Sequence, residues 1–248
     1  MKKLFQKIRN KWHADITSSI NEKTDKIISL QKATIHSNIF INSIQNCEWV
    51  SDKKFYPGRW AVDFSFLCTL FRVLNETKPK KILEFGLGQS SKLVHQYANF
   101  YENVEAVTGE HDKEWADFIK KSMPYSVNIK FLELEKRFYK GFETLSYKNI
   151  KNEFKNQKFN LIVIDAPFGQ SHYSRSQILE LLPDILEDSF CIILDDYNRT
   201  GEKETAQEMM NILNENNIKY FSAIYAGNKQ HFLLCSENVR FLTTMQII

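Results

Sequence analysis

Several features that would mark particular classes of protein are scarce in this chain. Among its 248 residues there are only 8 glycines and 4 cysteines. None of the cysteines stands at CxxC spacing, and no His-x-x-x-His element accompanies them, which disfavours both a zinc cluster and a disulfide framework. Buried free thiols in a reducing compartment are the simplest interpretation. No apolar run approaches the roughly 18 residues that a membrane-spanning helix needs, so we expect no transmembrane segment.

Charge of one sign is also not in large excess. Lysine and arginine number 33 against 30 aspartates and glutamates, a net charge of +3. This balance gives no indication of nucleic-acid binding, and we expect no such partner. The first residues, MKKLFQKIRNKW, are basic but lack the apolar core of a signal peptide, so we expect a cytoplasmic protein. The hydrophobic fraction of 43% is enough for a large core.

The segment 1–77 is predicted to be a helical extension. Apolar side chains recur every four residues near its start, and they form a helical stripe: Leu4, Ile8, Trp12, Ile16 and Ile20. One interpretation is a helix packed on its own domain or on a second subunit. The other is an interfacial helix attracted to anionic lipid, since its polar face is basic near the start. Because the stripe has no obvious partner within the chain, we expect homo-oligomerisation through this helix.

The segment 78–248 alternates predicted strands and helices. Continuous apolar strands separated by helices predict an α/β fold with a mostly parallel sheet covered on both faces. The predicted strands are 81–85, 104–108, 127–134, 159–164, 190–194, 220–226 and 232–235. The predicted helices are 61–74, which precedes the first strand, and 90–100, 112–121, 175–186 and 203–214. The polar stretch 147–158 is expected to be a surface insertion.

Acidic residues follow or end four of these strands. In an open parallel sheet, ligands bind beyond the carboxyl ends of the strands. A purely structural domain has no need to collect carboxylates at that edge, so we expect a binding site there. The acids are Glu84, Glu110, Asp165, Asp195 and Asp196.

The turn after the first strand, EFGLGQSS, carries the strongest signal. Gly86 and Gly88 let the backbone bend tightly and approach a ligand. Ser90 and Ser91 can cap the following helix, whose N-terminus attracts an anion such as a carboxylate. Glu84 suits an ammonium group or a hydroxyl, so a ligand with both an ammonium and a carboxylate fits best. The alternative is a tight strand–helix turn without a ligand.

The acid after the second strand extends this pattern. Glu110 lies 24 residues after Gly86, where an acid commonly accepts hydrogen bonds from ribose hydroxyls. The alternative is a solvated loop acid. Ser91 stands where the dinucleotide-binding pattern G-x-G-x-x-G has its third glycine, which disfavours a nicotinamide or flavin enzyme.

The segments KILEFGLGQSSK, VEAVTGEHD, FNLIVIDAPFG and FCIILDDYNR resemble motifs of class I S-adenosylmethionine-dependent methyltransferases. The likeness extends from about Lys80 to the C-terminus. It implies a Rossmann-like, mostly parallel seven-stranded sheet of order 3-2-1-4-5-7-6 with an antiparallel terminal strand pair. A looser likeness, in IDAPFG…SR…ILELLPDIL…FCIILDDYNRTGE, is to methyltransferase-like proteins associated with bacterial surface-glycan loci, and it suggests a sugar or glycan acceptor.

The resemblance also implies roles for particular residues. Those expected to bind or border S-adenosylmethionine are Glu84, Gly86, Gly88, Ser90, Ser91, Glu110, His111 and Asp165. N-terminal loops often cover the cofactor in this family, so Tyr56, Arg59 and Trp60 are expected to form a lid, with Trp60 on the cofactor. The alternative for Trp60 is an ordinary core residue. The adenine contact is expected near residues 133–135.

The expected reaction is O-methylation, with Asp165 or His172 as the base that takes the proton of the acceptor hydroxyl. In an alternative, Asp165, Asp195 and Asp196 bind Mg²⁺ or Ca²⁺, and the enzyme methylates a catechol or another small diol. These acids could instead pair with Arg175 or Arg199, or cap a helix. A third interpretation is a cofactor-binding partner protein without catalysis.

Overall fold

A computed structural model describes residues 2–58 and 60–244 of the chain, with the side chains of residues 2–5, 7 and 8 excepted. Its centre is a seven-stranded sheet with the strands β1 (Lys81–Phe85), β2 (Glu105–Glu110), β3 (Ile129–Phe131), β6 (Phe159–Ile164), β7 (Leu186–Leu194), β8 (Phe221–Ala226) and β9 (Gln230–Cys235). The strand order is β3-β2-β1-β6-β7-β9-β8. The first five strands in this order are parallel, and β9 runs antiparallel to both of its neighbours. The predicted sheet order is therefore confirmed.

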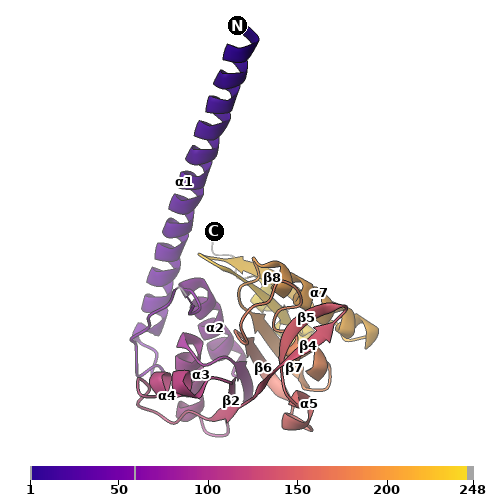
Figure 1. Cartoon of the computed structure of the whole chain (residues 1–248). Coiled ribbons are helices and arrows are strands. Elements are labelled where there is room, and N and C mark those ends of the chain that lie inside the picture. Colours follow the sequence, from indigo (N-terminus) through magenta and orange to yellow (C-terminus); the bar gives the residue numbers. More distant parts are fainter. Residues whose placement is uncertain (1, 59, 245–248) are drawn as a thin grey trace.

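Helices cover both faces of the sheet (Figure 1). The helices that follow α1 (Lys2–Gln45) are α2 (Phe64–Thr77), α3 (Gln89–Phe100), α4 (Lys113–Lys120), α5 (Ile150–Glu153), α6 (Gln177–Leu181), α7 (Thr200–Glu215) and the 3₁₀ segment η1 (Glu237–Thr244). Helix α2 begins at Asp63, whose carboxylate accepts the backbone N–H of Phe66 at 2.9 Å and so caps the helix.

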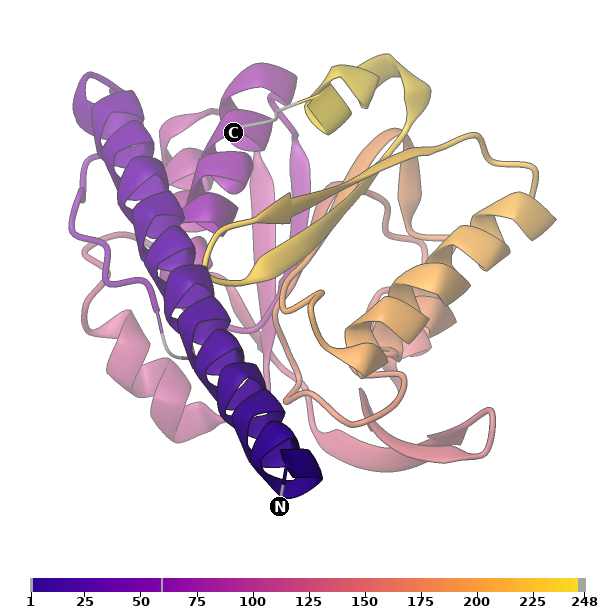
Figure 2. The same cartoon turned by 90° about the horizontal axis from the view of Figure 1, so that it is seen from above.

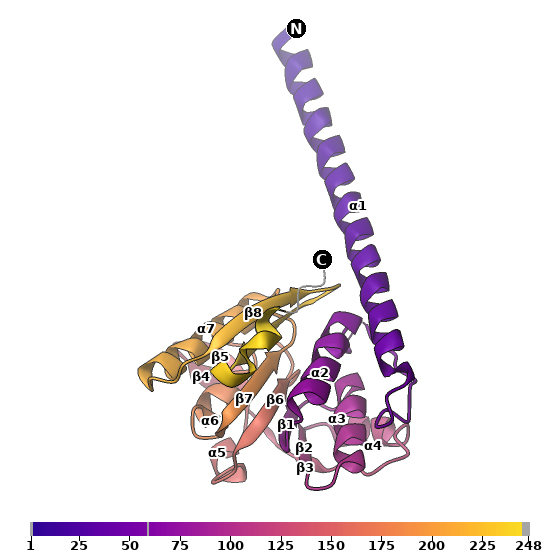
Figure 3. The ribbon, with the colours of Figure 1, turned by 180° about the vertical axis from the view of Figure 1, so that it is seen from behind.

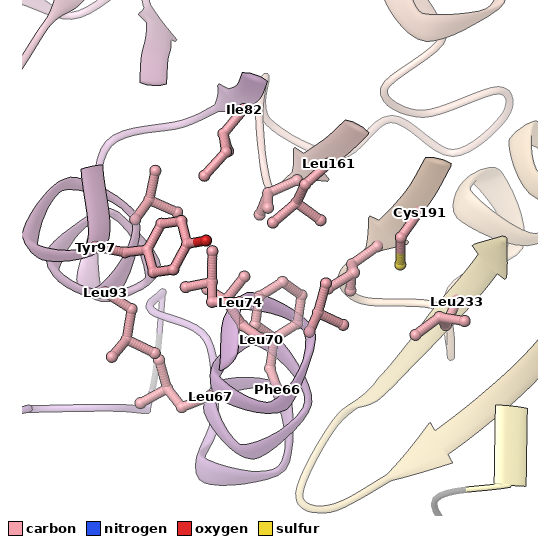
Figure 4. Packing of buried hydrophobic residues seen from close by; sticks show 14 of the residues in the cluster. Phe66, Leu67, Leu70, Leu74, Ile82, Leu93, Tyr97, Leu161, Cys191 and Leu233 are labelled. Atoms are coloured by element: carbon pink, nitrogen blue, oxygen red, sulfur yellow. The ribbon is translucent and has the colours of Figure 1, made fainter. Parts of the chain in front are cut away.

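The apolar strands divide their side chains between two cores. Ile82 and Leu161 point to the face covered by α2, α3 and the end of α1, whereas Leu83 and Ile162 point to the face covered by α5, α6 and α7. Successive side chains of a strand point to opposite faces, so a strand that is apolar throughout must be covered on both. Figure 4 shows the first core, in which Phe66 and Leu70 of α2 lie against the strands.

A hairpin that the sequence analysis did not predict lies beside the sheet. Strands β4 (Leu134–Tyr139) and β5 (Phe142–Tyr147) pair with each other as a separate antiparallel sheet. Only residues 129–131 of the predicted strand 127–134 join the main sheet. Most residues of 147–158 are exposed, as expected of a surface insertion, but Tyr147, Ile150 and Phe154 anchor the segment in the second core.

The predicted helix 175–186 is also wrong in its extent. Helix α6 ends at Leu181, and β7 begins at Leu186. Pro183 has no N–H to donate and disfavours a helical conformation at Leu182, which explains the early end.

Helix α1 extends far from the rest of the chain (Figures 1 and 3), and in the view from above it crosses in front of the domain (Figure 2). Among the described side chains of α1, those buried against the domain lie in its C-terminal part, around Phe40 and Ile44. Apolar side chains of its free part are exposed: Trp12 by 69%, Ile16 by 49% and Ile20 by 57%. The described helices include none that is both long and apolar enough to cross a membrane.

Leu4 and Ile8, the first members of the predicted stripe, lie outside the described side chains. The division of the chain at residues 77 and 78 stays a prediction, and α2 shares its core with the strands.

We expect the exposed stripe of α1 to mediate self-association. Ile16→Lys combined with Ile20→Lys places two charges on the stripe, so an oligomeric wild type should become a monomer of about 29 kDa in light scattering. Ala14→Lys combined with Ser18→Lys is the control, because both residues are also exposed but lie on the opposite side of the helix from Ile16 and Ile20. A wild type that is already monomeric at high concentration would contradict this prediction, and binding to anionic vesicles would then be measured for the same variants.

Candidate functional site

The register of the parallel strands brings the sequence-predicted acids to one edge. Phe85 pairs with Gly109 and with Ile164, and Ile164 pairs with Leu194. The residues that follow these positions therefore leave the sheet side by side. Backbone hydrogen bonds continue past the strand ends: the Asp165 N–H donates to the Phe85 carbonyl at 2.9 Å, and the Asp195 N–H to the Ile164 carbonyl at 3.0 Å.

The turn after β1 has the shape of a ligand cradle. Gly86 has φ of +99°, and a Cβ there would lie 2.9 Å from the Cβ of Ala166, so only glycine fits. A Cβ on Gly88 would meet nothing within 4 Å, so the backbone borders open space. Two side chains hold the turn from outside. The Glu110 carboxylate accepts the Leu87 N–H at 3.0 Å, and the Trp115 indole donates to the Leu87 carbonyl at 2.7 Å.

Glu84 is completely buried beside this turn. Its Oε2 accepts a hydrogen bond from the Thr108 hydroxyl at 2.8 Å, and in the described chain its Oε1 has no hydrogen-bond partner. Burial raises the pKa of Glu84 to about 7, against the opposing effect of the hydroxyls of Ser91, Ser90 and Thr108. A buried carboxylate with one free oxygen matches a ligand that brings a positive charge or a hydrogen-bond donor.

Ser91 is part of the helix start, though as its third residue rather than its cap. Its hydroxyl accepts the N–H of Gly88, the N-cap of α3, at 2.8 Å. Ser90 and Ser91 are both buried next to Glu84. Backbone N–H groups in the first turn of an α-helix lack intrahelical acceptors and can bind an anion.

Glu110 lies at the end of β2 as an ionised carboxylate. It accepts the N–H groups of Leu87 at 3.0 Å, His111 at 2.6 Å and Asp112 at 2.9 Å. Burial would raise the pKa of Glu110, but the His111 ring and these hydrogen bonds outweigh it and lower the pKa. The ring of His111 lies 5.6 Å from that of Phe168, on the loop after β6. Glu110 thus organises the turn, and its contact with a ribose stays a prediction.

The three aspartates at the ends of β6 and β7 do come together. Each of Asp165, Asp195 and Asp196 places an oxygen within 4.8 Å of the others. Arg175, buried on the loop after β6, pairs with Asp196 at 2.7 Å and with Asp165 at 3.1 Å. The pairing with Arg175 that the sequence analysis left open is therefore present.

Two further cations lie against the same aspartates. Lys229, from the turn between β8 and β9, places its Nζ 3.5 Å from Asp195 and 3.3 Å from Asp196, and Arg199 approaches Asp196 to 3.0 Å. Burial would raise the pKa of Asp196, but the charges of Arg175, Lys229 and Arg199 outweigh it and lower the pKa. Burial and the neighbouring negative charge of Asp195 raise the pKa of Asp165 well above its ordinary value.

His172 and Trp60 lie in different surroundings. The His172 Nδ1 is 2.9 Å from Glu204 of α7, and its ring stacks on Phe142 of the hairpin with 4.0 Å between centroids. Trp60 is 83% exposed. The loop before it does reach α3, because the Tyr56 N–H donates to Gln89 at 2.8 Å. Arg59 lies outside the described residues, and the lid stays a prediction.

In the segment expected to contact adenine, Glu133 pairs with Lys148 at 3.2 Å and Glu135 with Arg137. That contact stays a prediction.

Three residues of this region escaped the sequence analysis: Trp115, Tyr147 and Lys229. Tyr147 stacks on Phe85 with 5.6 Å between ring centroids, and its buried hydroxyl has no hydrogen-bond partner within the described residues. Lys229 lies in the connection between the predicted strands 220–226 and 232–235. That position was the one available signal.

Comparison with known proteins adds the fold family. No protein-family model matches the chain, and no curated protein matches its sequence. Among solved structures, cofactor-bound Rv0187 from MTB is 14% identical, with a TM-score of 0.51 over 86% of this chain and 89% of that chain. The SAH-bound methyltransferase PaMTH1 from Podospora anserina is 14% identical, with a TM-score of 0.51 over 86% of this chain and 95% of that chain.

The strand order and these likenesses show that the chain has the class I S-adenosylmethionine-dependent methyltransferase fold. The expected fold class is confirmed.

We expect Glu84 to make the ligand-free protein less stable as pH rises. Its folded-state pKa of about 7 exceeds the ordinary 4.5, so the stabilisation present below pH 4.5 is lost as pH rises through 7. Glu84→Gln removes this titration, and the wild type should lose on the order of 3 kcal/mol relative to the variant between pH 4.5 and pH 8. Urea denaturation of both proteins across this range measures the difference. Parallel curves would show that Glu84 does not titrate there.

Proposed function

We propose that this protein is an S-adenosylmethionine-dependent methyltransferase that methylates an oxygen, with a sugar or glycan hydroxyl as the acceptor. The observation that carries the proposal is Glu84, a completely buried carboxyl just before the glycine turn whose Oε1 has no hydrogen-bond partner within the described residues. A buried carboxylate with one unpaired oxygen and no cation beside it, at this place in a methyltransferase fold, fits a cationic ligand group.

The residues present fit the methionine part and the ribose of the cofactor. Glu84 would hold the ammonium of its methionine part, and the first turn of α3 would hold the carboxylate. Glu110 already carries its negative charge at the end of β2, and its carboxylate would accept the ribose hydroxyls. When bound, S-adenosylmethionine supplies a methyl group on a sulfonium, which an oxygen nucleophile can displace.

The transfer then needs an oriented acceptor and a base for its proton. Asp165 lies partly buried at the end of β6, where burial and the charge of Asp195 raise its pKa and make its carboxylate a stronger base than an ordinary aspartate. His172 is the second candidate, because its contact with Glu204 through Nδ1 leaves Nε2 to accept a proton. The sugar acceptor is supported by the looser sequence likeness described above.

Glu110→Ala is expected to weaken S-adenosylmethionine binding roughly ten- to hundredfold, because a charge-assisted pair of hydrogen bonds is lost. Titration calorimetry measures the affinity, and circular dichroism checks the fold, since Glu110 also holds the turn. Glu114→Ala, which removes an exposed acid from the first turn of α4, is the control. Unchanged affinity in Glu110→Ala would remove the ribose role, and a wild type that binds no cofactor would remove the proposed function.

Asp165→Asn is expected to lower turnover about 10²- to 10⁴-fold while changing cofactor affinity little, because asparagine keeps the shape but cannot take a proton. Acceptors come from a methyl-transfer screen with sugars, phenols and small acids, followed by formation of S-adenosylhomocysteine. Asp184→Asn, at an exposed position after α6, is the control. Full activity in Asp165→Asn would show that Asp165 is not the base. His172 would then be the candidate, and His172→Gln would test it. Cofactor binding without transfer to any acceptor would favour a non-catalytic partner protein.

A further inference from the structure

The guanidinium of Arg175 is inserted among the three aspartates with every terminal N–H used. Nη1 donates to the backbone carbonyls of Asp195 at 2.8 Å and Ile164 at 3.3 Å. Nη2 donates to the carboxylates of Asp196 at 2.7 Å and Asp165 at 3.1 Å. The side chain is 3% exposed. One rigid planar cation therefore joins the ends of β6 and β7.

The aspartates alone would make a plausible donor set for a divalent cation, since hard ions such as Mg²⁺ prefer carboxylate oxygens. Such an ion needs its oxygen ligands at about 2.0–2.6 Å. Arg175 already donates to one oxygen of Asp165 and one of Asp196. The Asp195 oxygens accept no hydrogen bond within the described residues, but a second cation placed between the three carboxylates would lie directly beside the guanidinium. With Arg175 in this position, the aspartates do not fit a metal.

Most of the negative charge of the cluster is also already offset. Three cations, Arg175, Lys229 and Arg199, face the three aspartates and the buried Glu202, so at most one net negative charge remains. Lys229 is held in place separately, because its Nζ also donates to the Ala61 carbonyl at 3.1 Å and its backbone N–H to Asp63 at 3.0 Å. Little negative charge remains to attract a divalent ion.

The loop that carries Arg175 is anchored on α7. The Ser174 hydroxyl donates to Glu202 at 2.9 Å, and the Thr205 hydroxyl donates to the Ser174 carbonyl at 2.6 Å. These bonds fix the backbone from which Arg175 enters the cluster. Withdrawal of the guanidinium would break its four hydrogen bonds and leave buried carboxylates unpaired, which is strongly unfavourable.

We propose that Arg175 takes the place of a divalent cation at the ends of β6 and β7, so that the protein binds no metal at Asp165, Asp195 and Asp196. The consequence for chemistry rests on the proposed function. Methyl transfer at this site is independent of metal, and the acceptor need not offer two adjacent oxygens for chelation. This favours a single hydroxyl as acceptor over the catechol or small-diol alternative.

The test is Mn²⁺ binding to the full chain, followed by electron paramagnetic resonance and calorimetry. The wild type is expected to bind no Mn²⁺ at these aspartates at millimolar concentration. Arg175→Met removes the charge and the hydrogen bonds but keeps the bulk, so it should gain one Mn²⁺ site, with affinity raised on the order of tenfold or more. Arg199→Met is the matched control: it removes the same charge from the more exposed edge of the cluster and leaves Arg175 in place, so no site should appear.

Two results would overturn the proposal. One is a wild type that binds one Mn²⁺ per chain and loses it in Asp196→Asn. The other is a folded Arg175→Met protein that gains no site, which would show that the guanidinium is not what excludes the metal. If Arg175→Met does not fold, Arg175→Gln replaces it, because an amide can still donate to the Asp195 carbonyl. Since Mn²⁺ binding needs no cofactor, failure here is separate from failure of S-adenosylmethionine binding.

Discussion

The candidate site of this protein depends on the register of three parallel strands that are buried on both faces. Because Phe85, Ile164 and Leu194 are in register, β1, β6 and β7 end together, and the side chains that follow them share one edge. The cores on either side of the sheet hold this register, since a slip of one residue would exchange the side chains of the two faces. The edge therefore collects acidic groups that are only partly accessible to water.

The cost of burying each of these carboxyl groups is offset in a different way. Glu84 has few compensating contacts, and burial raises its pKa to about 7. Glu110 stays ionised because three backbone N–H groups donate to it. The aspartates are compensated by cations, chiefly Arg175. Glu84 lacks a cationic partner that a ligand could supply, whereas Asp165 and Asp196 already share Arg175. Asp195 makes no hydrogen bond through its carboxylate within the described residues, and Lys229 lies 3.5 Å from it.

The local sequence pattern predicted much of the fold but less of the candidate site. The sequence predicted the apolar strands and the glycine turn, because a strand buried on both faces requires apolar residues and a tight turn requires glycine. It also predicted the acids, because they stand at the ends of those strands. The hairpin β4–β5 was not predicted, because its residues lie beside the main sheet and are only partly buried. The anchoring of residues 147–158 in the core was not predicted for a related reason: its three buried side chains, Tyr147, Ile150 and Phe154, stand among exposed polar neighbours.

The sequence by itself determined the class of sheet, its strand order through the family resemblance, and the acids at its edge. Only the tertiary structure decided which cations meet those acids. Lys229 is far along the chain from Asp165, and its backbone is tied to Asp63 across 166 positions. Such pairings depend on how distant turns close over one edge of the sheet. Periodicity within a strand or helix carries no information about that closure, because it records only which face of each element is buried.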